Sequence, residues 1–210
     1  MMAIEGTLMA AVVARLNEPE YNLAAYGVAL AVALLVEAPV IMMMTASTAL
    51  VTDRLSYFKL RNFAFFLSLA ISALMAFLAI PPVFRVVSIT LLKLPVPISE
   101  LTIPCILLLL PWPGMIGYRR FYQGLLIRDD KTHLVAVGTL IRLITMATVA
   151  LGLFLWGDLP GAWVAATSLS TGVTVEAIAS RVMANQTVKH LLQIEKSDRD
   201  VVSYPFIANF

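Results

Sequence analysis

One long apolar stretch, residues 23–52, constrains this chain more than any other feature of its sequence. A bilayer core about 30 Å thick needs roughly 20 helical residues, so this stretch is long enough to cross a membrane. Glu37 lies near its middle, and Pro39 follows two residues later. A charge at that depth costs at least about 2.5 to 3.5 kcal/mol, so we expect Glu37 to face a partner or a water-filled cavity rather than lipid. Pro39 predicts a helix break, because it leaves the carbonyl of Leu35 without its helical donor.

The composition agrees with a helical membrane protein along the whole chain. The 210 residues are 60% hydrophobic and 13% charged, and the charges gather between apolar runs. A soluble domain of this size has a different balance, so the fold class predicted is all-α and integral to the membrane. The net charge of +2 is small, which argues against a nucleic-acid partner. No metal-ligand spacing, phosphate loop or nucleophile motif is present, so the sequence predicts no enzyme, cofactor or metal.

We expect about six membrane helices, of which the first is incomplete. Residues 1–13 are apolar but too short to cross. Full spans are predicted at 23–52, 62–80, 101–117, 132–156 and 161–185. Prolines predict where two of these spans bend, and we take Pro39, Pro111 and Pro113 as candidate hinges. Residues 1–190 are expected to form one helical lobe, and 191–210 a polar cytoplasmic tail or a linker to a second lobe.

Basic residues predict the orientation of the bundle. Ten Lys and Arg residues fall in segments 53–61 and 118–131 and after residue 185, against three in the alternate loops. The positive-inside rule therefore places those two segments and the C-terminus in the cytoplasm. Within the second segment, YRRFYQGLLIR has apolar residues at helical spacing. It is either an amphipathic helix at the cytoplasmic interface or a continuation of the fourth span into water.

Two ionisable residues are expected at similar depth in the bundle. Glu37 and Arg142 each lie about 16 to 22 Å from their membrane ends, so they could meet near the midplane. Such a pair would be a structural lock between helices or a site for substrate or a coupling ion, unless the two never meet. In a continuous helix, Tyr26 and Thr48 would share a face with Glu37.

The last predicted span carries further polar groups. Thr167, Thr171 and Thr174 fall on one stripe, and Glu176 points nearly opposite. A stripe of hydroxyls can line a pore or hold helices together. Glu176 and Thr171 are therefore further candidates for binding substrate or an ion.

Three segments together resemble a known transporter superfamily. They are NLAAYGVALAVALLVEAPVIMMMTASTALVTDRLSY, LLLLPWPGMIGYRRFYQGLLIR and VGTLIRL. They look like the N-terminal half of a multidrug/oligosaccharidyl-lipid/polysaccharide exporter. That superfamily includes the multidrug and toxin extrusion (MATE) transporters, lipid-linked oligosaccharide flippases and progressive-ankylosis-type exporters. The resemblance implies one six-helix lobe of a two-lobe fold with a central cavity.

The function that this resemblance implies is secondary active transport. The chain would be one lobe of an alternating-access exporter or flippase for an amphiphilic or organic-ion substrate, in the inner membrane of a bacterium. A second lobe, or a second copy of the chain, would complete the cavity. The alternatives are a non-transporting membrane scaffold or a truncated fragment of a longer transporter, and, with the least support, an intramembrane enzyme.

Overall fold

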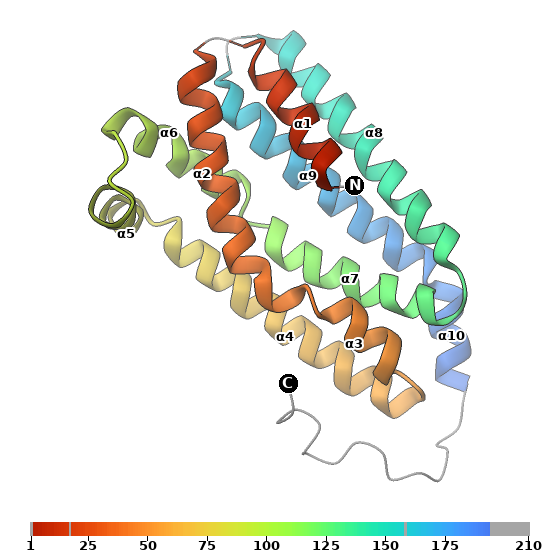
Figure 1. Cartoon of the computed structure of the whole chain (residues 1–210). Coiled ribbons are helices and arrows are strands. Elements are labelled where there is room, and N and C mark those ends of the chain that lie inside the picture. The colour runs from red at the N-terminus through yellow and green to blue at the C-terminus, as the bar shows by residue number, and fades with distance from the viewer. Residues whose placement is uncertain (1, 17, 158, 194–210) are drawn as a thin grey trace.

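The computed structural model describes residues 2–16, 18–157 and 159–193, and they form a helical bundle (Figure 1). The α-helices are α1 Met2–Val13, α2 Pro19–Glu37, α3 Met43–Leu50, α4 Arg54–Leu78, α5 Pro81–Arg85, α6 Val96–Leu108, α7 Trp112–Arg128, α8 Thr132–Trp156, α9 Gly161–Met183 and α10 Asn185–Gln193. A 3₁₀ turn, Ala38–Val40, joins α2 to α3, and a π-helix, Val86–Leu91, follows α5. Most of the predicted tail, 194–210, lies outside the described residues.

Among the described residues, four segments are long and apolar enough to cross a membrane. They are Pro19–Leu50, Arg54–Leu78, Val96–Arg128 and Thr132–Trp156. Large apolar side chains such as Leu35, Phe66 and Leu155 remain exposed on them. A water-soluble protein would not expose such faces, so the fold indicates an integral membrane protein. The sequence predicts a fifth full span at 161–185. Helix α9 is continuous there, but it is not among these four segments.

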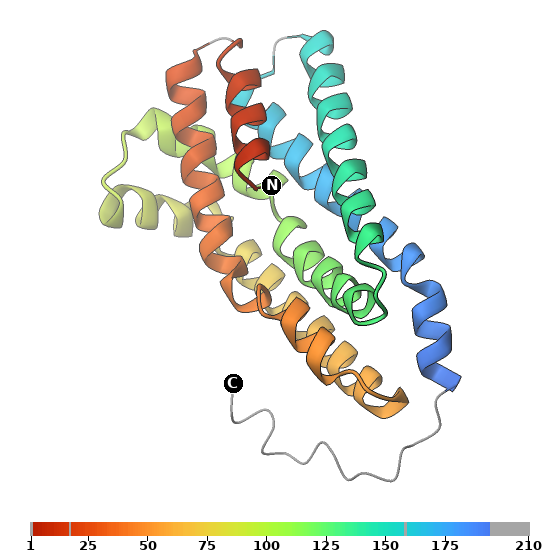
Figure 2. The ribbon, with the colours of Figure 1, turned by 45° about the vertical axis from the view of Figure 1, so that its right-hand side comes forward.

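Helix α9 lies in the middle of the bundle, and most of its residues are buried. It packs against α1, α2, α6, α7 and α8, and Figures 1 and 2 both show it beside α8. Small residues allow these close approaches: a Cβ added at Gly172 would lie 3.3 Å from the Arg142 carbonyl oxygen. A helix covered by other helices needs less apolar surface than one covered by lipid, which explains its Ser-rich and Thr-rich sequence.

Two of the four apolar segments are broken at prolines. In the first, the chain leaves α-helical geometry at Ala38, and the Ala38 N–H donates to the Leu35 carbonyl. The carbonyl that Pro39 deprives of its usual donor is thus satisfied by a tighter turn. In the second, α6 ends at Leu108 and α7 restarts at Trp112, after Pro111. The predicted breaks are confirmed; hinge motion stays a prediction.

Helix α7 corrects one expectation about segment 118–131. The sequence places this segment in a basic loop, but α7 runs unbroken to Arg128 and packs against α2, α3, α4 and α9. Of the two interpretations of YRRFYQGLLIR, the structure shows a continued helix, but this helix continues inside the bundle and not into water. Its buried glycines permit this packing: a Cβ at Gly124 would lie 2.4 Å from the Met44 carbonyl oxygen. Arg119 is therefore inside the bundle, only 4% exposed.

Candidate functional site

A cluster of charged side chains lies buried where α7, α8 and α9 meet. Glu176 on α9 is 0% exposed, and its Oε2 forms an ion pair with Nη1 of Arg119 on α7. The same oxygen lies 3.3 Å from Nε of Arg142 on α8. Gln123 Nε2 donates to Glu176 Oε1 at 3.1 Å. One carboxylate thus holds three helices together.

The sequence builds this cluster through simple helical spacing. Arg119 and Gln123 are four residues apart on α7, so they project from the same face and reach both oxygens of one carboxylate. Gly138 on α8 lies beside Glu176, and a Cβ added there would be in ordinary contact with Glu176 Cγ, at 3.6 Å. A buried ion of this kind is tolerable only with such partners, because its desolvation costs several kcal/mol.

Glu37 lies in a different environment. It ends α2, directly before the break, and is 1% exposed. Neither of its carboxylate oxygens has a hydrogen-bond partner within the described part of the chain. The positive charges that act on it most are those of Arg120 and then Arg119. Glu37 is thus a buried carboxylate near positive charge but without a direct partner.

The expected pairing of Glu37 with Arg142 is therefore wrong. The carboxylate beside Arg142 belongs to Glu176. The reason is the position of α7: Arg119 and Arg120, expected in a cytoplasmic loop, lie on a helix packed into the bundle and supply the positive charges that act most on Glu37. Arg142 consequently faces α9.

The remaining predicted site residues do not converge on Glu37. Tyr26 is buried on α2, before the proline break. The Thr48 hydroxyl lies 2.9 Å from the Met44 carbonyl and 3.2 Å from the Gly124 carbonyl, so it links α3 to α7. The Thr171 hydroxyl donates to the Thr167 carbonyl in its own helix at 2.7 Å. Thr174 bonds in the same way to Ser170, so these two hydroxyls lie against their own helix backbone.

Sequence reasoning missed three residues of the site: Arg119, Arg120 and Gln123. Their location was indicated in part, because no proline separates Gly114 from Arg128. The periodicity could not show that all faces of this helix are covered. Among the described residues, no group of three or more His, Cys, Asp or Glu side chains is placed to hold a metal ion.

Comparisons of the chain with protein families, with curated proteins and with solved structures find no match. The fold defines the chain as a helical integral membrane protein, with a buried charge cluster where α7, α8 and α9 meet.

Proposed function

We propose that this chain is one lobe of a secondary active transporter, a MATE-like exporter or flippase that works by alternating access. The observation that carries the proposal is Glu37, a carboxylate that is 1% exposed and has no hydrogen-bond partner on either oxygen among the described residues. Ionisable groups inside membrane spans are costly and are kept mainly for function. Glu37 also adjoins a broken helix, which is the usual setting of substrate and coupling-ion sites in transporters.

The two buried glutamates would then have different roles. Glu176 already has Arg119, Arg142 and Gln123 around it, so it locks α7, α8 and α9 into one unit. Glu37 has an unfilled bonding capacity and can take up a proton, a cation or a cationic group of a substrate. Occupation of Glu37 would change the charge beside the α2–α3 break, and this gives a way to couple an ion to helix movement.

The charge balance bears on the type of substrate. Arg119, Arg120 and Arg142 stand against Glu37 and Glu176, and the electrostatic interactions of Arg120 extend to the other four. When all five are ionised, the cluster carries one surplus positive charge. Neutralising Glu37 raises that surplus to two. An amphiphilic or organic ion would therefore meet a different field in the loaded and empty states.

The orientation belongs to the same proposal. The α3–α4 and α7–α8 connections would face the cytoplasm of a bacterium, with Arg54, Lys59, Arg128 and Lys131 near them. Because Arg119 lies inside the bundle, it no longer counts toward the basic residues on the cytoplasmic side, but those residues still outnumber the ones on the opposite side. A second lobe or a second copy of the chain would supply the opposite wall of the cavity.

A non-transporting scaffold is the second candidate, and one observation favours it. Arg142 and Glu176 are packed and paired, with side-chain exposures of 6% and 0%, as expected for a lock between helices. The two functions differ at Glu37, because a scaffold has no use for a buried carboxylate without a direct partner.

The test is gradient-driven movement of the fluorescent cation ethidium in proteoliposomes. We expect the wild type to move ethidium under an imposed proton or sodium gradient, and Glu37→Gln to abolish the gradient-dependent part. Glu100→Gln, which removes an exposed carboxylate, is the matched control and should be unchanged. Equal flux in the Glu37→Gln variant would exclude the role of Glu37. No gradient-driven flux from the wild type would contradict transport by paired copies of this chain.

A further inference from the structure

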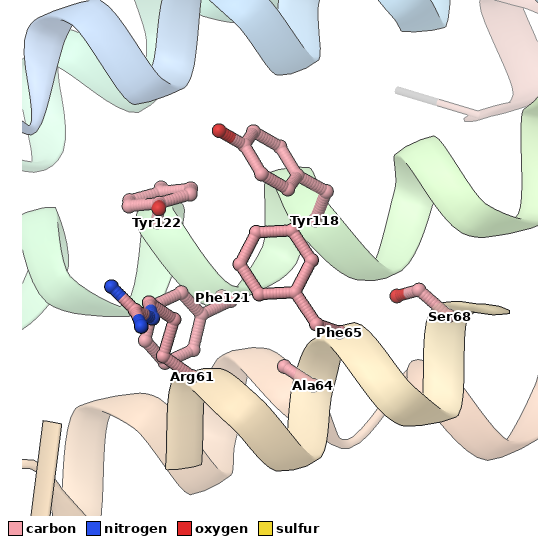
Figure 3. Close-up of a pocket in the computed structure, with 7 residues that line it drawn as sticks. All are labelled: Arg61, Ala64, Phe65, Ser68, Tyr118, Phe121 and Tyr122. Carbon is pink, nitrogen blue, oxygen red and sulfur yellow. The ribbon is translucent and has the colours of Figure 1, made fainter. Parts of the chain in front are cut away.

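A small pocket opens between α4 and α7, apart from the buried charge cluster. Its lining residues are Arg61, Ala64, Phe65, Ser68, Tyr118, Phe121 and Tyr122, and they enclose about 180 Å³ including the open side. Positions 61, 64, 65 and 68 share one face of α4, and 118, 121 and 122 share one face of α7. Figure 3 shows Arg61 and Ser68 at opposite ends, with the α7 rings across from them.

Arg61 brings a positive charge to this pocket. Its guanidinium lies over the rings of Phe58 and Tyr57, with centroid distances of 4.8 and 5.7 Å. In the described part of the chain it forms no salt bridge with a carboxylate. Its Nη2 donates to the Asn62 side chain at 3.2 Å. The Nε is buried and has no hydrogen-bond partner there, and the same holds for Ser68 Oγ.

The position of Arg61 along α4 sets its level in the membrane. It lies seven residues after the helix begins, about 10 Å from that end, and no charged residue follows it in 62–80. Arg61 therefore marks the boundary between water and hydrocarbon, where phospholipid phosphates lie. Beyond it, the exposed side chains of Phe65, Phe66 and Leu69 continue along α4 as an apolar path.

We propose that this pocket binds one anionic phospholipid, with its phosphate on Arg61 and an acyl chain passing Phe65 toward Leu69. An arginine whose face is held against aromatic rings can still donate from its terminal nitrogens to phosphate oxygens. Basic pockets between membrane helices on the cytoplasmic side are typical sites for anionic lipid headgroups. The small Ala64 leaves space between the aromatic walls.

The test is competitive lipid binding to the full chain in detergent, measured by native mass spectrometry. The probes are dioleoyl phosphatidylglycerol, which is anionic, and dioleoyl phosphatidylcholine, which is zwitterionic with the same chains. We expect the wild type to prefer phosphatidylglycerol, and Arg61→Gln to lower that preference roughly fivefold. Lys59→Gln removes the same charge two residues away on a different face of α4, and it should keep the preference.

Two further measurements test whether the lipid binds specifically in this pocket. Ala64→Leu fills the pocket and should lower the binding of both lipids, and circular dichroism would confirm that each variant is helical. If that variant does not fold, the comparison of Arg61→Gln with Lys59→Gln decides the matter. Inorganic phosphate in excess should not displace the lipid. Displacement by phosphate, equal binding of the two lipids by the wild type, or equal losses in the Arg61 and Lys59 variants would overturn the proposal.

Discussion

The two buried glutamates show how much neighbouring residues decide the role of a charge. Glu176 accepts from Arg119 and Gln123, whereas the oxygens of Glu37 have no hydrogen-bond partner among the described residues. Both residues could be picked from the sequence, because a carboxylate in an apolar helix stands out. Their partners could not, because helical periodicity does not show which faces of two distant helices meet. That is why Arg142 was assigned to the wrong glutamate.

Removal of the Glu176 charge should strongly destabilise the protein. Glu176→Gln removes the carboxylate that forms an ion pair with the buried Arg119, and we expect a loss of about 3 to 5 kcal/mol. The measurement is thermal unfolding in detergent, followed by circular dichroism. The control is Glu100→Gln, whose pair with Arg85 is exposed, with side-chain exposures of 61% and 57%; it should cost less than about 1 kcal/mol. Equal effects of the two variants would contradict the locking role of Glu176.

The cap at the start of α4 predicts a dependence of stability on pH. The Ser56 side-chain hydroxyl and then its backbone N–H bond the Asp53 carboxylate and hold its pKa below the ordinary value of 3.8. A lowered folded-state pKa adds stability above the unfolded value, and this contribution is lost as the pH falls through the folded value. We expect wild-type stability to fall, relative to Asp53→Asn, as the pH drops below 3.8.

Asparagine is the suitable comparison for this cap, because it keeps a capping oxygen but does not titrate. Unfolding of both proteins would be followed by circular dichroism at several acidic pH values. A stability difference between them that does not change with pH would contradict the role given to the Asp53 charge.

At the scale of elements, close helix contacts depend on particular glycines. A Cβ at Gly124 on α7 would lie 2.4 Å from the Met44 carbonyl oxygen on α3, whereas one at Gly152 on α8 meets nothing within 4 Å. We expect Gly124→Ala to lower the melting temperature, because backbone must move apart to make room. Gly152→Ala should leave it unchanged or raise it, with a gain of up to about 1 kcal/mol. The same direction of shift in both variants would contradict the packing of α3 on α7.

The sequence predicted elements with unequal success. Residues 23–52, 62–80 and 132–156 could be recognised because lipid-facing helices need long apolar runs, and the breaks could be placed because proline cannot donate. Helices α7 and α9 were harder to interpret. Each is buried among other helices, so polar residues occur on it without being exposed to water. From composition alone, α7 therefore resembles a basic loop, and α9 resembles an ordinary membrane span.

For the molecule as a whole, the arrangement of spans predicts which ends face the same side. Thr52 lies in the α3–α4 connection and Asp130 in the α7–α8 connection, whereas Leu159 lies between α8 and α9. In a Cys105→Ala background, we expect cysteines at 52 and 130 to be labelled by a membrane-impermeant maleimide only from the cytoplasmic side. A cysteine at 159 should be labelled only from the opposite side. Labelling of positions 130 and 159 from one side would contradict a membrane-spanning α8.

The central inference is that Glu37 can bind a proton or a cation, whereas Glu176 is held by its buried partners. It is tested most directly with dicyclohexylcarbodiimide, an apolar reagent that modifies protonated carboxyl groups in apolar surroundings, followed by mapping of the modified peptides by mass spectrometry. We predict modification at Glu37, and none at Glu176 because Arg119, Arg142 and Gln123 already contact its two carboxylate oxygens. Modification of Glu176 to the same extent as Glu37, or no modification of Glu37, would contradict the account.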